Sequence, residues 1–297
     1  MSFLFVDRII ETVPGQYIKG VKHVTYDDSY LAKAPDGSLQ FIPSLIGEAL
    51  GQLAAWNVMA QLDFCKRPVA GIASGAKMLK AVNPGDTIIL ESFIDKYDNQ
   101  AVEYHSQAMV DGHIVFELKN ALGPMLPMND FIDGDTVKNQ YAQILRTEDS
   151  YTPSDGFFKS FAEEVSFQRQ AHIDFDAIKN FEAGKSITAL KLVNKAASYF
   201  SDHFPLKPVL PLTVLLEAKL RLAQYFITQS GLADAISQCE VKRVKMSDFV
   251  HPGDELICHL KMKSHKDQEI VLTFKSEVNG RRVCVAEISF LGVEPKQ

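Results

Sequence analysis

Apolar positions in this chain fall into two long helical segments and a larger number of alternating segments. Residues 44–62 and 212–229 are long and mostly apolar, and each follows a proline that can open a helix. Polar and apolar residues alternate, as in strands, over residues 87–93, 102–110, 255–262, 270–278 and 282–290. Because one long helix is followed by several strands twice over, the pattern predicts an α+β fold.

The two halves of the chain are copies of one another. Asn83-Pro84-Gly85-Asp86 reappears 168 residues later as His251-Pro252-Gly253-Asp254, and Asp111-Gly112 reappears as Asn279-Gly280. Near the start of each copy the shift is 169 residues, which indicates compensating insertions and deletions of single residues. Asp-Gly and Asn-Gly favour the positive φ angles of tight hairpins, so we expect antiparallel sheets.

The repeat predicts how the chain is divided into domains. We expect a first repeat over residues 1–128, a connector over residues 129–170 and a second repeat over residues 171–297. The connector is polar, apart from an amphipathic stretch from Val137 to Arg146. Because about 40 residues is longer than an ordinary loop, a helix packed on the surface is predicted there.

Composition and charge limit the classes of protein to which the chain can belong. It has 297 residues, of which 46% are hydrophobic and 23% charged, as in globular proteins. The net charge of −6 and the lack of a basic stripe argue against binding to nucleic acid. The first ten residues do not resemble a signal peptide, and no apolar run is long enough to span a membrane. Since the four cysteines show no C-x-x-C spacing, we expect reduced thiols, no metal site and a cytoplasmic location.

The first predicted helix contains an isolated charged residue, Glu48, within an otherwise uncharged run from Gly37 to Leu62. We expect its carboxyl group to be buried, and burial raises the pKa of a carboxylic acid, which can then act as a general acid. Gln52 lies one turn further along the helix and is placed to hold the carboxyl group. The residues alone leave two interpretations open: a general acid, or a structural carboxylate satisfied by an arginine or by backbone.

The second helix carries a glutamate in a different setting. Glu217 is followed four residues later by Arg221, and residues four apart lie on the same face of a helix. Pairing with a cation favours the ionised carboxylate, which is a poor proton donor. The spacing therefore favours a structural ion pair at Glu217.

The segment before the second helix carries a motif that resembles a known family. It begins with His203-Phe204-Pro205, continues with prolines at 208 and 211, and reaches Glu217 14 residues after the histidine. This spacing resembles the active-site signature of the 3-hydroxyacyl-acyl carrier protein dehydratases. Phe3–Arg8 resembles that family's opening strand motif, and Glu48–Gln52 resembles its helix, so that the resemblance covers both copies.

The resemblance implies the hot-dog fold, in which a curved antiparallel sheet wraps around one long helix. Two copies in one chain imply a double hot dog, an intrachain pseudo-dimer that leaves further homo-oligomerisation open. In this family each active site takes its histidine from one subunit and its acidic residue from the other. His203 is therefore expected to face Glu48, whereas Ala34 stands at the histidine position of the first copy and faces Glu217, so that only one of the two sites is active.

The resemblance also implies an activity, the removal of water from a 3-hydroxyacyl thioester to give a trans-2-enoyl thioester in fatty acid or polyketide-type synthesis. His203 takes the proton from C2, and Glu48 donates to or positions the C3 hydroxyl. An amide at a helix N-terminus, near Leu212 or Ser44, is expected to bind the thioester oxygen. The other positions expected to contact substrate are Gln52, Phe204 and Pro211.

Two departures from the family pattern leave other activities open. Leu212 stands where the family has a glycine, and its side chain is expected to narrow the substrate channel. Four residues separate Pro43 from Glu48, but five separate Pro211 from Glu217, and a slip of one residue turns a helical side chain by about 100°. A hot-dog acyl thioesterase and a non-catalytic acyl-binding subunit therefore remain alternatives to the dehydratase.

The implied partner is an acyl carrier protein or coenzyme A, which presents the acyl group on a phosphopantetheine arm, and no other cofactor is implied. Acyl carrier proteins are acidic, so docking on this acidic chain requires a local basic surface. Lys242, Arg243 and Lys245 provide one in the second copy, and Lys77 with Lys80 provides a sparser one in the first. A solvated strand edge is the alternative interpretation of these residues.

Overall fold

The computed structural model describes residues 3–25, 28–34, 37–148, 173–193, 197–201, 203–233, 235–266 and 268–293. The first repeat contains a long helix and nine strands: β1 Arg8–Val13, β2 Tyr17–His23, β3 Leu31–Lys33, β4 Leu39–Phe41, α1 Pro43–Gln61, β5 Lys66–Pro68, β6 Ile72–Met78, β7 Thr87–Tyr97, β8 Ala101–Val110 and β9 His113–Pro127. Two short elements follow it: the 3-10 helix η1 Met128–Asp130 and the helix α2 Gly134–Ile144.

The second repeat has the same order of elements around its own long helix. Its elements are β10 Ala177–Glu182, β11 Ser186–Leu192, the 3-10 helix η2 Ser198–Ser201, α3 Leu212–Gln229, β12 Ala235–Met246, β13 Glu255–Lys266, β14 Glu269–Val278 and β15 Arg281–Val293. Both long helices lie where the sequence predicted them. The segment before α3 has η2 where the first repeat has the small hairpin of β3 and β4, because three prolines between residues 205 and 211 disfavour strand pairing.

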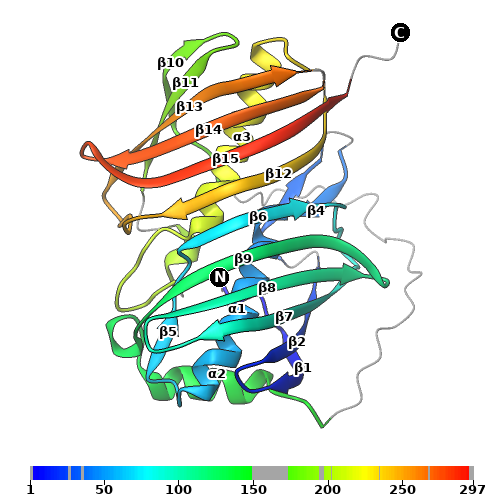
Figure 1. The fold of residues 1–297 in the computed structure, drawn as a ribbon, viewed down its shortest axis with the longest axis vertical. Coiled ribbons are helices and arrows are strands. Elements are labelled where there is room, and N and C mark those ends of the chain that lie inside the picture. Colours follow the sequence, from blue (N-terminus) through cyan, green and yellow to red (C-terminus); the bar gives the residue numbers. More distant parts are fainter. Residues whose placement is uncertain are drawn as a thin grey trace.

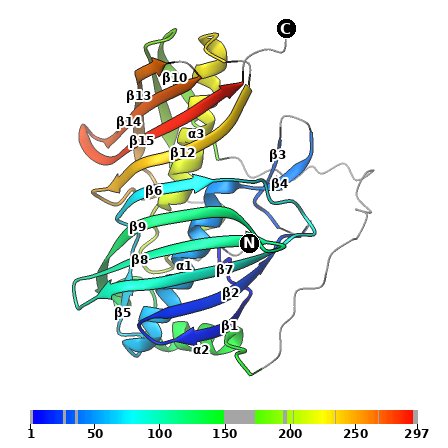
Figure 2. The same cartoon turned by 45° about the vertical axis from the view of Figure 1, so that its right-hand side comes forward.

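The strands of the two repeats join into one antiparallel sheet, in the order β1-β2-β7-β8-β9-β6-β12-β15-β14-β13-β11-β10, with β5 paired to β9. The repeats meet where β6 pairs with β12, with Ala73 opposite Val244 and Ala76 opposite Val241. Each half of the sheet curves around its own helix (Figures 1 and 2). The predicted α+β architecture with two wrapped helices is therefore confirmed.

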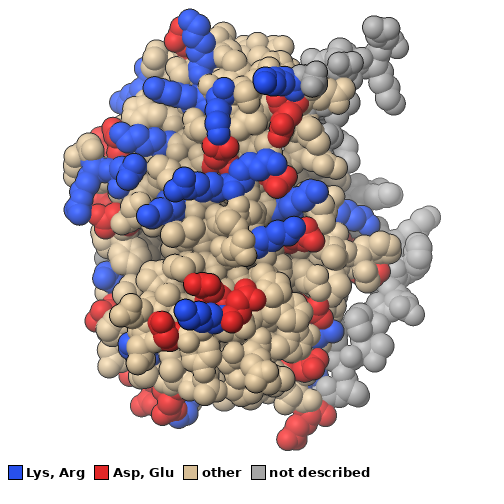
Figure 3. Space-filling view, in the orientation of Figure 1, with Lys and Arg blue, Asp and Glu red and all other residues tan. Residues whose placement is uncertain are grey.

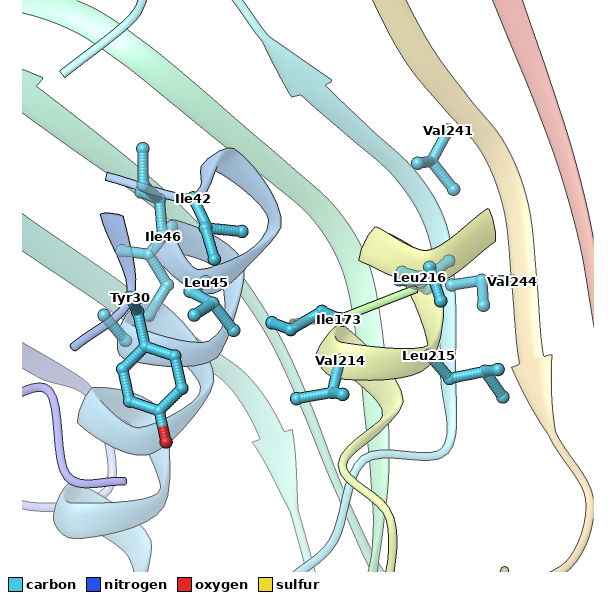
Figure 4. Packing of buried hydrophobic residues seen from close by; sticks show 14 of the residues in the cluster. Tyr30, Ile42, Leu45, Ile46, Ile173, Val214, Leu215, Leu216, Val241 and Val244 are labelled. Atoms are coloured by element: carbon cyan, nitrogen blue, oxygen red, sulfur yellow. The ribbon is translucent and has the colours of Figure 1, made fainter. Parts of the chain in front are cut away.

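The N-terminal ends of the two long helices pack against each other at the seam between the repeats. Leu45 of α1 and Val214 of α3 point toward one another, with Ile173 between them (Figure 4). All three side chains are buried, and Val241 and Val244 of β12 extend this apolar contact toward the sheet. Because the contact lies on the pseudo-twofold axis, the helix ends and their polar side chains come close to one another across the seam.

The two long helices begin at equivalent residues, so the different spacing from the prolines does not rotate Glu48 relative to Glu217. α1 begins at Pro43 with Ile42 as its N-cap, whereas α3 begins at Leu212 with Pro211 as its N-cap. The proline is thus the first helical residue of one helix and the cap of the other. Counted from the cap, Glu48 and Glu217 both occupy the sixth position, and the 100° rotation does not occur.

Residues Phe3–Asp7 do not form the strand that the resemblance implied, because β1 begins only at Arg8. The amide of Phe5 instead donates to Gln52 Oε1, and the carbonyl of Phe3 accepts from Gln52 Nε2, both at 2.9 Å. A side chain of α1 thus satisfies the backbone groups that a neighbouring strand would otherwise pair. The two phenylalanine rings are buried and meet edge to face, with their centroids 4.8 Å apart.

Within the expected connector, the described residues contain a helix, α2, capped by Asp133, whose side chain accepts from the Thr136 amide. Val137 is buried, and Tyr141 packs on Trp56 of α1 and on Phe64, with ring centroids 5.8 and 5.5 Å away. Residues 149–172 lie outside the described residues. No helix in the described part of the chain is long and apolar enough to cross a membrane.

Candidate active site

A cavity of about 170 Å³ lies between α1, the N-terminus of α3 and the inner face of the first repeat's sheet. Along α1 its wall includes Gly47, Gly51, Ala55 and Met59, which follow one another at intervals of four residues, beside Glu48, Gln52 and Trp56. A side chain at Gly51 would reach within 3.4 Å of the Tyr104 hydroxyl. The small residues on this face therefore leave the space that the cavity fills.

His203 enters this cavity from the loop before α3. Its Nδ1 is 3.2 Å from the carbonyl oxygen of Val209, which can only accept, so this nitrogen carries a hydrogen. The Nε2 atom of the neutral ring is then free to accept a proton. The ring stacks on Phe204 with centroids 4.1 Å apart and meets the edge of Phe3 at 5.6 Å. These contacts fix both the orientation and the tautomer of the imidazole.

Glu48 enters the same cavity from α1, on the other repeat. Its Oε1 accepts from Gln52 Nε2 at 3.0 Å, as the sequence predicted, and its Oε2 accepts from Thr213 Oγ1 at 2.8 Å. The distance from Oε1 to His203 Nε2 is 4.0 Å, and the two side chains are 12% and 17% exposed. The structure therefore brings the expected histidine and carboxylate together across the seam, with both groups open to the cavity.

Burial keeps the imidazole of His203 neutral. Removal from water lowers the pKa of His203 below its ordinary value of 6.5, and the positive charge of Arg67 acts in the same direction. The negative charge of Glu48 and the hydrogen bond to Val209 oppose this shift. Since the net direction is downward, the ring is deprotonated at neutral pH and can act as a base.

The equivalent position of the second repeat is closed by other side chains. Glu217 Oε1 accepts from Arg221 Nε at 3.0 Å, and Oε2 accepts from Ser44 Oγ at 3.0 Å. Arg221 also contacts Asp174 at 3.3 Å, so the predicted ion pair is part of a small network. Ala34, which we expected opposite Glu217, lies in the turn between β3 and β4, where its amide donates to Ser38.

The remaining expected substrate contacts divide into two groups. Leu212, Gln52 and Phe204 line the cavity. Pro211 is not among the residues that line it; it is the N-cap of α3, and its carbonyl accepts from the Leu215 amide. Ser44, whose amide was the alternative to that of Leu212, does not line this cavity, and its hydroxyl donates to Glu217.

The expected docking residues lie on the outer face of β12, beside the seam. Lys242, Arg243 and Lys245 are exposed, and Lys242 pairs with Glu240 at 2.9 Å. Basic side chains gather on this face over the strands of the second repeat, whereas the first repeat shows few of them (Figure 3). Met246, the residue after Lys245, lines the cavity, whereas the three basic residues do not.

Comparison with known proteins identifies the family. A FabA-like domain model matches residues 172–287. The 3-hydroxyacyl-[acyl-carrier-protein] dehydratase FabZ of Pediococcus pentosaceus is 32% identical over 119 residues, which are 39% of this chain and 79% of that protein. The chain belongs to the FabZ-like dehydratase family. The similarity to FabZ proteins lies in the C-terminal part of the chain.

Solved structures extend the fold comparison of this FabZ-like protein to the whole chain. The dehydratase domain of PpsC from Mycobacterium tuberculosis, solved in complex with C12:1-CoA, matches with a TM-score of 0.57 and 12% identity, covering 99% of this chain and all of that one. An acyl-ACP thioesterase from Bacteroides thetaiotaomicron matches with a TM-score of 0.51 and 12% identity over 92% of this chain and 97% of its own. At such low identity these matches show the double hot-dog fold and no activity.

Several polar residues of this FabZ-like cavity were not found from the sequence. Thr213 was detectable, because it stands at the same helical position as Ser44, 169 residues earlier, and each binds the glutamate of the other repeat. Arg67 and Tyr104 lie on β5 and β8 with no motif around them. The described residues contain no group of three or more His, Cys, Asp or Glu side chains that could hold a metal ion.

Proposed function

We propose that this FabZ-like protein dehydrates a 3-hydroxyacyl thioester, carried by an acyl carrier protein or coenzyme A, to the trans-2-enoyl thioester. The observation that carries the proposal is the approach of His203 Nε2 to Glu48 Oε1, 4.0 Å apart, at the wall of an otherwise mainly apolar cavity. A neutral imidazole and a carboxyl group that face the same point can act on adjacent carbons of one substrate. Fatty acid synthesis is the process with which the family is associated.

Each of the two side chains has one task in the reaction. His203 Nε2 takes the proton from C2, the C3–O bond breaks, and the electron pair of the C2–H bond forms the C2=C3 double bond. Glu48 acts in its protonated form: it gives its proton to the departing hydroxyl, which leaves as water, and becomes the carboxylate. Transfer of the proton from His203 to Glu48 then restores both groups. Gln52 and Thr213 hold the carboxyl group in position during these steps.

The N-terminus of α3 supports binding of the thioester oxygen. The first amides of a helix have no partner within the helix, and Pro211 as N-cap offers no side-chain hydrogen bond to them. Leu212 and Thr213 line the cavity at this point. We assign the amide of Leu212 to the negative charge that develops on the thioester oxygen, a task for which helix N-termini are suited.

A parallel assay separates the proposal from its alternatives. Purified protein is given 3-hydroxyacyl and saturated acyl thioesters of several chain lengths, and enoyl thioester absorbance is recorded beside free-thiol release. The proposal expects enoyl product from the 3-hydroxyacyl substrates without free thiol. Free thiol from saturated substrates would instead indicate a thioesterase, and neither product at any chain length would indicate a binding subunit.

The pH profile of kcat/KM is expected to fall on the acid side with a midpoint below 6.5. The base must be neutral, and the pKa of His203 is lowered by burial, so activity is retained until the pH drops through that lowered value. The measurement is kcat/KM against pH in the free enzyme, with stability checked at each pH. A midpoint at or above 6.5 would contradict the assignment of the buried histidine as base.

Charge reversal of the basic surface on β12 is expected to weaken docking of an acyl carrier protein. For the double variant Arg243→Glu and Lys245→Glu, KM for a carrier-linked substrate should rise about tenfold or more, less so at high salt, because exposed charges are screened. The KM for a pantetheine-linked substrate and kcat for both substrates should be unchanged. Lys261→Glu on β13 is the matched control, and an equal effect there would argue against a defined docking surface.

A further inference from the structure

The cavity contains a cation that the proposed reaction does not use. Arg67 of β5 lines the cavity, and its Nε atom is buried without a hydrogen-bond partner. No ion pair joins its guanidinium to any residue that the structure describes. The rest of this part of the cavity is largely apolar, with Val69, Val102 and Ile132 in its wall.

Aromatic rings, not carboxylates, hold the guanidinium of Arg67 in place. Its central carbon lies 3.8 Å from the centroid of the Phe204 ring and 5.9 Å from that of Phe131. Because His203 stacks on Phe204 at 4.1 Å as well, the Phe204 ring separates the arginine from the histidine. Stacking uses the face of a guanidinium and leaves the N–H donors at its edge available to a ligand.

Arg67 remains a cation in this position. Burial lowers its pKa to about 10, and the negative charge of Glu48 limits that decrease. Both carboxylate oxygens of Glu48 already accept hydrogen bonds, from Gln52 and from Thr213. The guanidinium therefore retains its charge at neutral pH while its donors remain unsatisfied by the described residues.

A second polar group points into the same cavity. Tyr104 of β8 lines it, and its hydroxyl lies beside Gly51, where an added Cβ would be 3.4 Å from that oxygen. The hydroxyl forms no hydrogen bond with any residue in the described part of the chain. Burial raises the pKa of Tyr104, so the phenol keeps its proton and can donate it.

A plain hydrocarbon chain is a poor occupant for such a cavity. It would exclude water from the guanidinium and leave buried donors unsatisfied, which is unfavourable, above all for a charged group. An acceptor oxygen on the acyl chain would remove this cost and form a charge-assisted hydrogen bond. We propose that the preferred acyl group carries such an oxygen, of a carboxylate or a ketone, and that Arg67 binds it. That the acyl group is presented as a thioester rests on the proposed function.

Binding of unreactive ligands tests this specificity separately from catalysis. The probes are hexanoyl-, 5-oxohexanoyl- and adipoyl-pantetheine, which lack a 3-hydroxyl and differ in the oxygen near the end of the chain. Calorimetric titration of the full chain should give at least about tenfold tighter binding of an oxygenated probe than of the hexanoyl probe. Preference for adipoyl indicates a carboxylate ligand, and preference for 5-oxohexanoyl indicates a ketone.

Variants of Arg67 supply the decisive comparison. Arg67→Met should reduce the advantage of the oxygenated probe to less than about twofold while hexanoyl binding is kept or improved, and Arg67→Lys should retain part of the advantage. Lys207→Met is the matched control, because Lys207 Nζ lies 5.2 Å from the Phe131 ring but does not line the cavity. Thermal unfolding of each variant checks that it folds.

Two results would overturn the inference. One is equal or tighter binding of the hexanoyl probe to the unmodified protein. The other is an unchanged preference in folded Arg67→Met. Failure of the proposed function would look different, since enoyl product would then be missing with every 3-hydroxyacyl thioester while the probe preference and its loss in Arg67→Met remained.

Discussion

Replacement of His203 by alanine is expected to lower kcat for enoyl thioester formation by about 10²- to 10⁴-fold, the usual contribution of a general base. Glu48→Gln should cause a loss of similar size, because an amide cannot donate the proton that the departing hydroxyl needs. The double variant should be little worse than either single one, since the two groups act on the same step. The measurement is the initial rate of enoyl product at saturating substrate.

The chain provides its own control for this experiment. Glu217 occupies the same helical position as Glu48, but both of its oxygens are bound by Arg221 and Ser44, and the first repeat carries Ala34, not a histidine, at the equivalent position. Glu217→Gln should therefore keep kcat within about twofold. If Glu217→Gln reduced the rate as strongly as Glu48→Gln, or if His203→Ala remained fully active, the one-site proposal would be wrong.

Removal of Arg221 is expected to destabilise the protein without removing activity. Arg221→Met leaves Glu217, of which only 7% is exposed, with Ser44 as its remaining partner. An unsatisfied buried charge of this kind costs about 1–3 kcal/mol, and each kcal/mol lowers the Tm of a chain this long by about 2–4 °C. Urea unfolding and thermal scans measure the loss, while enoyl product formation should change less than twofold.

A double variant shows whether this loss comes from the unpaired charge that Arg221→Met leaves on Glu217. Arg221→Met combined with Glu217→Gln removes the charge that the single variant leaves unpaired. Its free energy of unfolding should therefore be higher than that of Arg221→Met alone. The effects of the two substitutions are then not additive, as is usual for residues in contact. Equal stability of the two variants would mean that the unpaired charge of Glu217 has no measurable cost.

Short sequence patterns predicted much of the fold. The Asp111-Gly112 and Asn279-Gly280 turns have positive φ at all four residues, as hairpin chemistry requires, and the strands beside them pair as expected. Two long apolar segments became helices wrapped by sheet. These features depend on backbone preference and on the period of apolar residues, both of which can be read within ten to twenty residues.

Such short patterns did not determine where each glutamate lies around the axis of its helix. Counting from the prolines left open a rotation of Glu48 relative to Glu217, but Pro43 is the first residue of its helix and Pro211 is the cap of the other. Proline is compatible with both positions, because neither requires its missing N–H. The choice is made by the contacts of the whole helix with its sheet, which the local sequence does not contain.

The sequence by itself determined the internal repeat, the wrapped helices, and the unequal chemistry of the two glutamates, since Gln52 follows one and Arg221 the other at the same spacing. Only the tertiary structure decided that His203 and Glu48 lie 4.0 Å apart, and that Arg67 faces the same cavity with its donors free. The reason is physical: spacing along one helix fixes its own neighbours, whereas a cavity is formed by segments that are distant in sequence and meet only when the sheet closes around the helices.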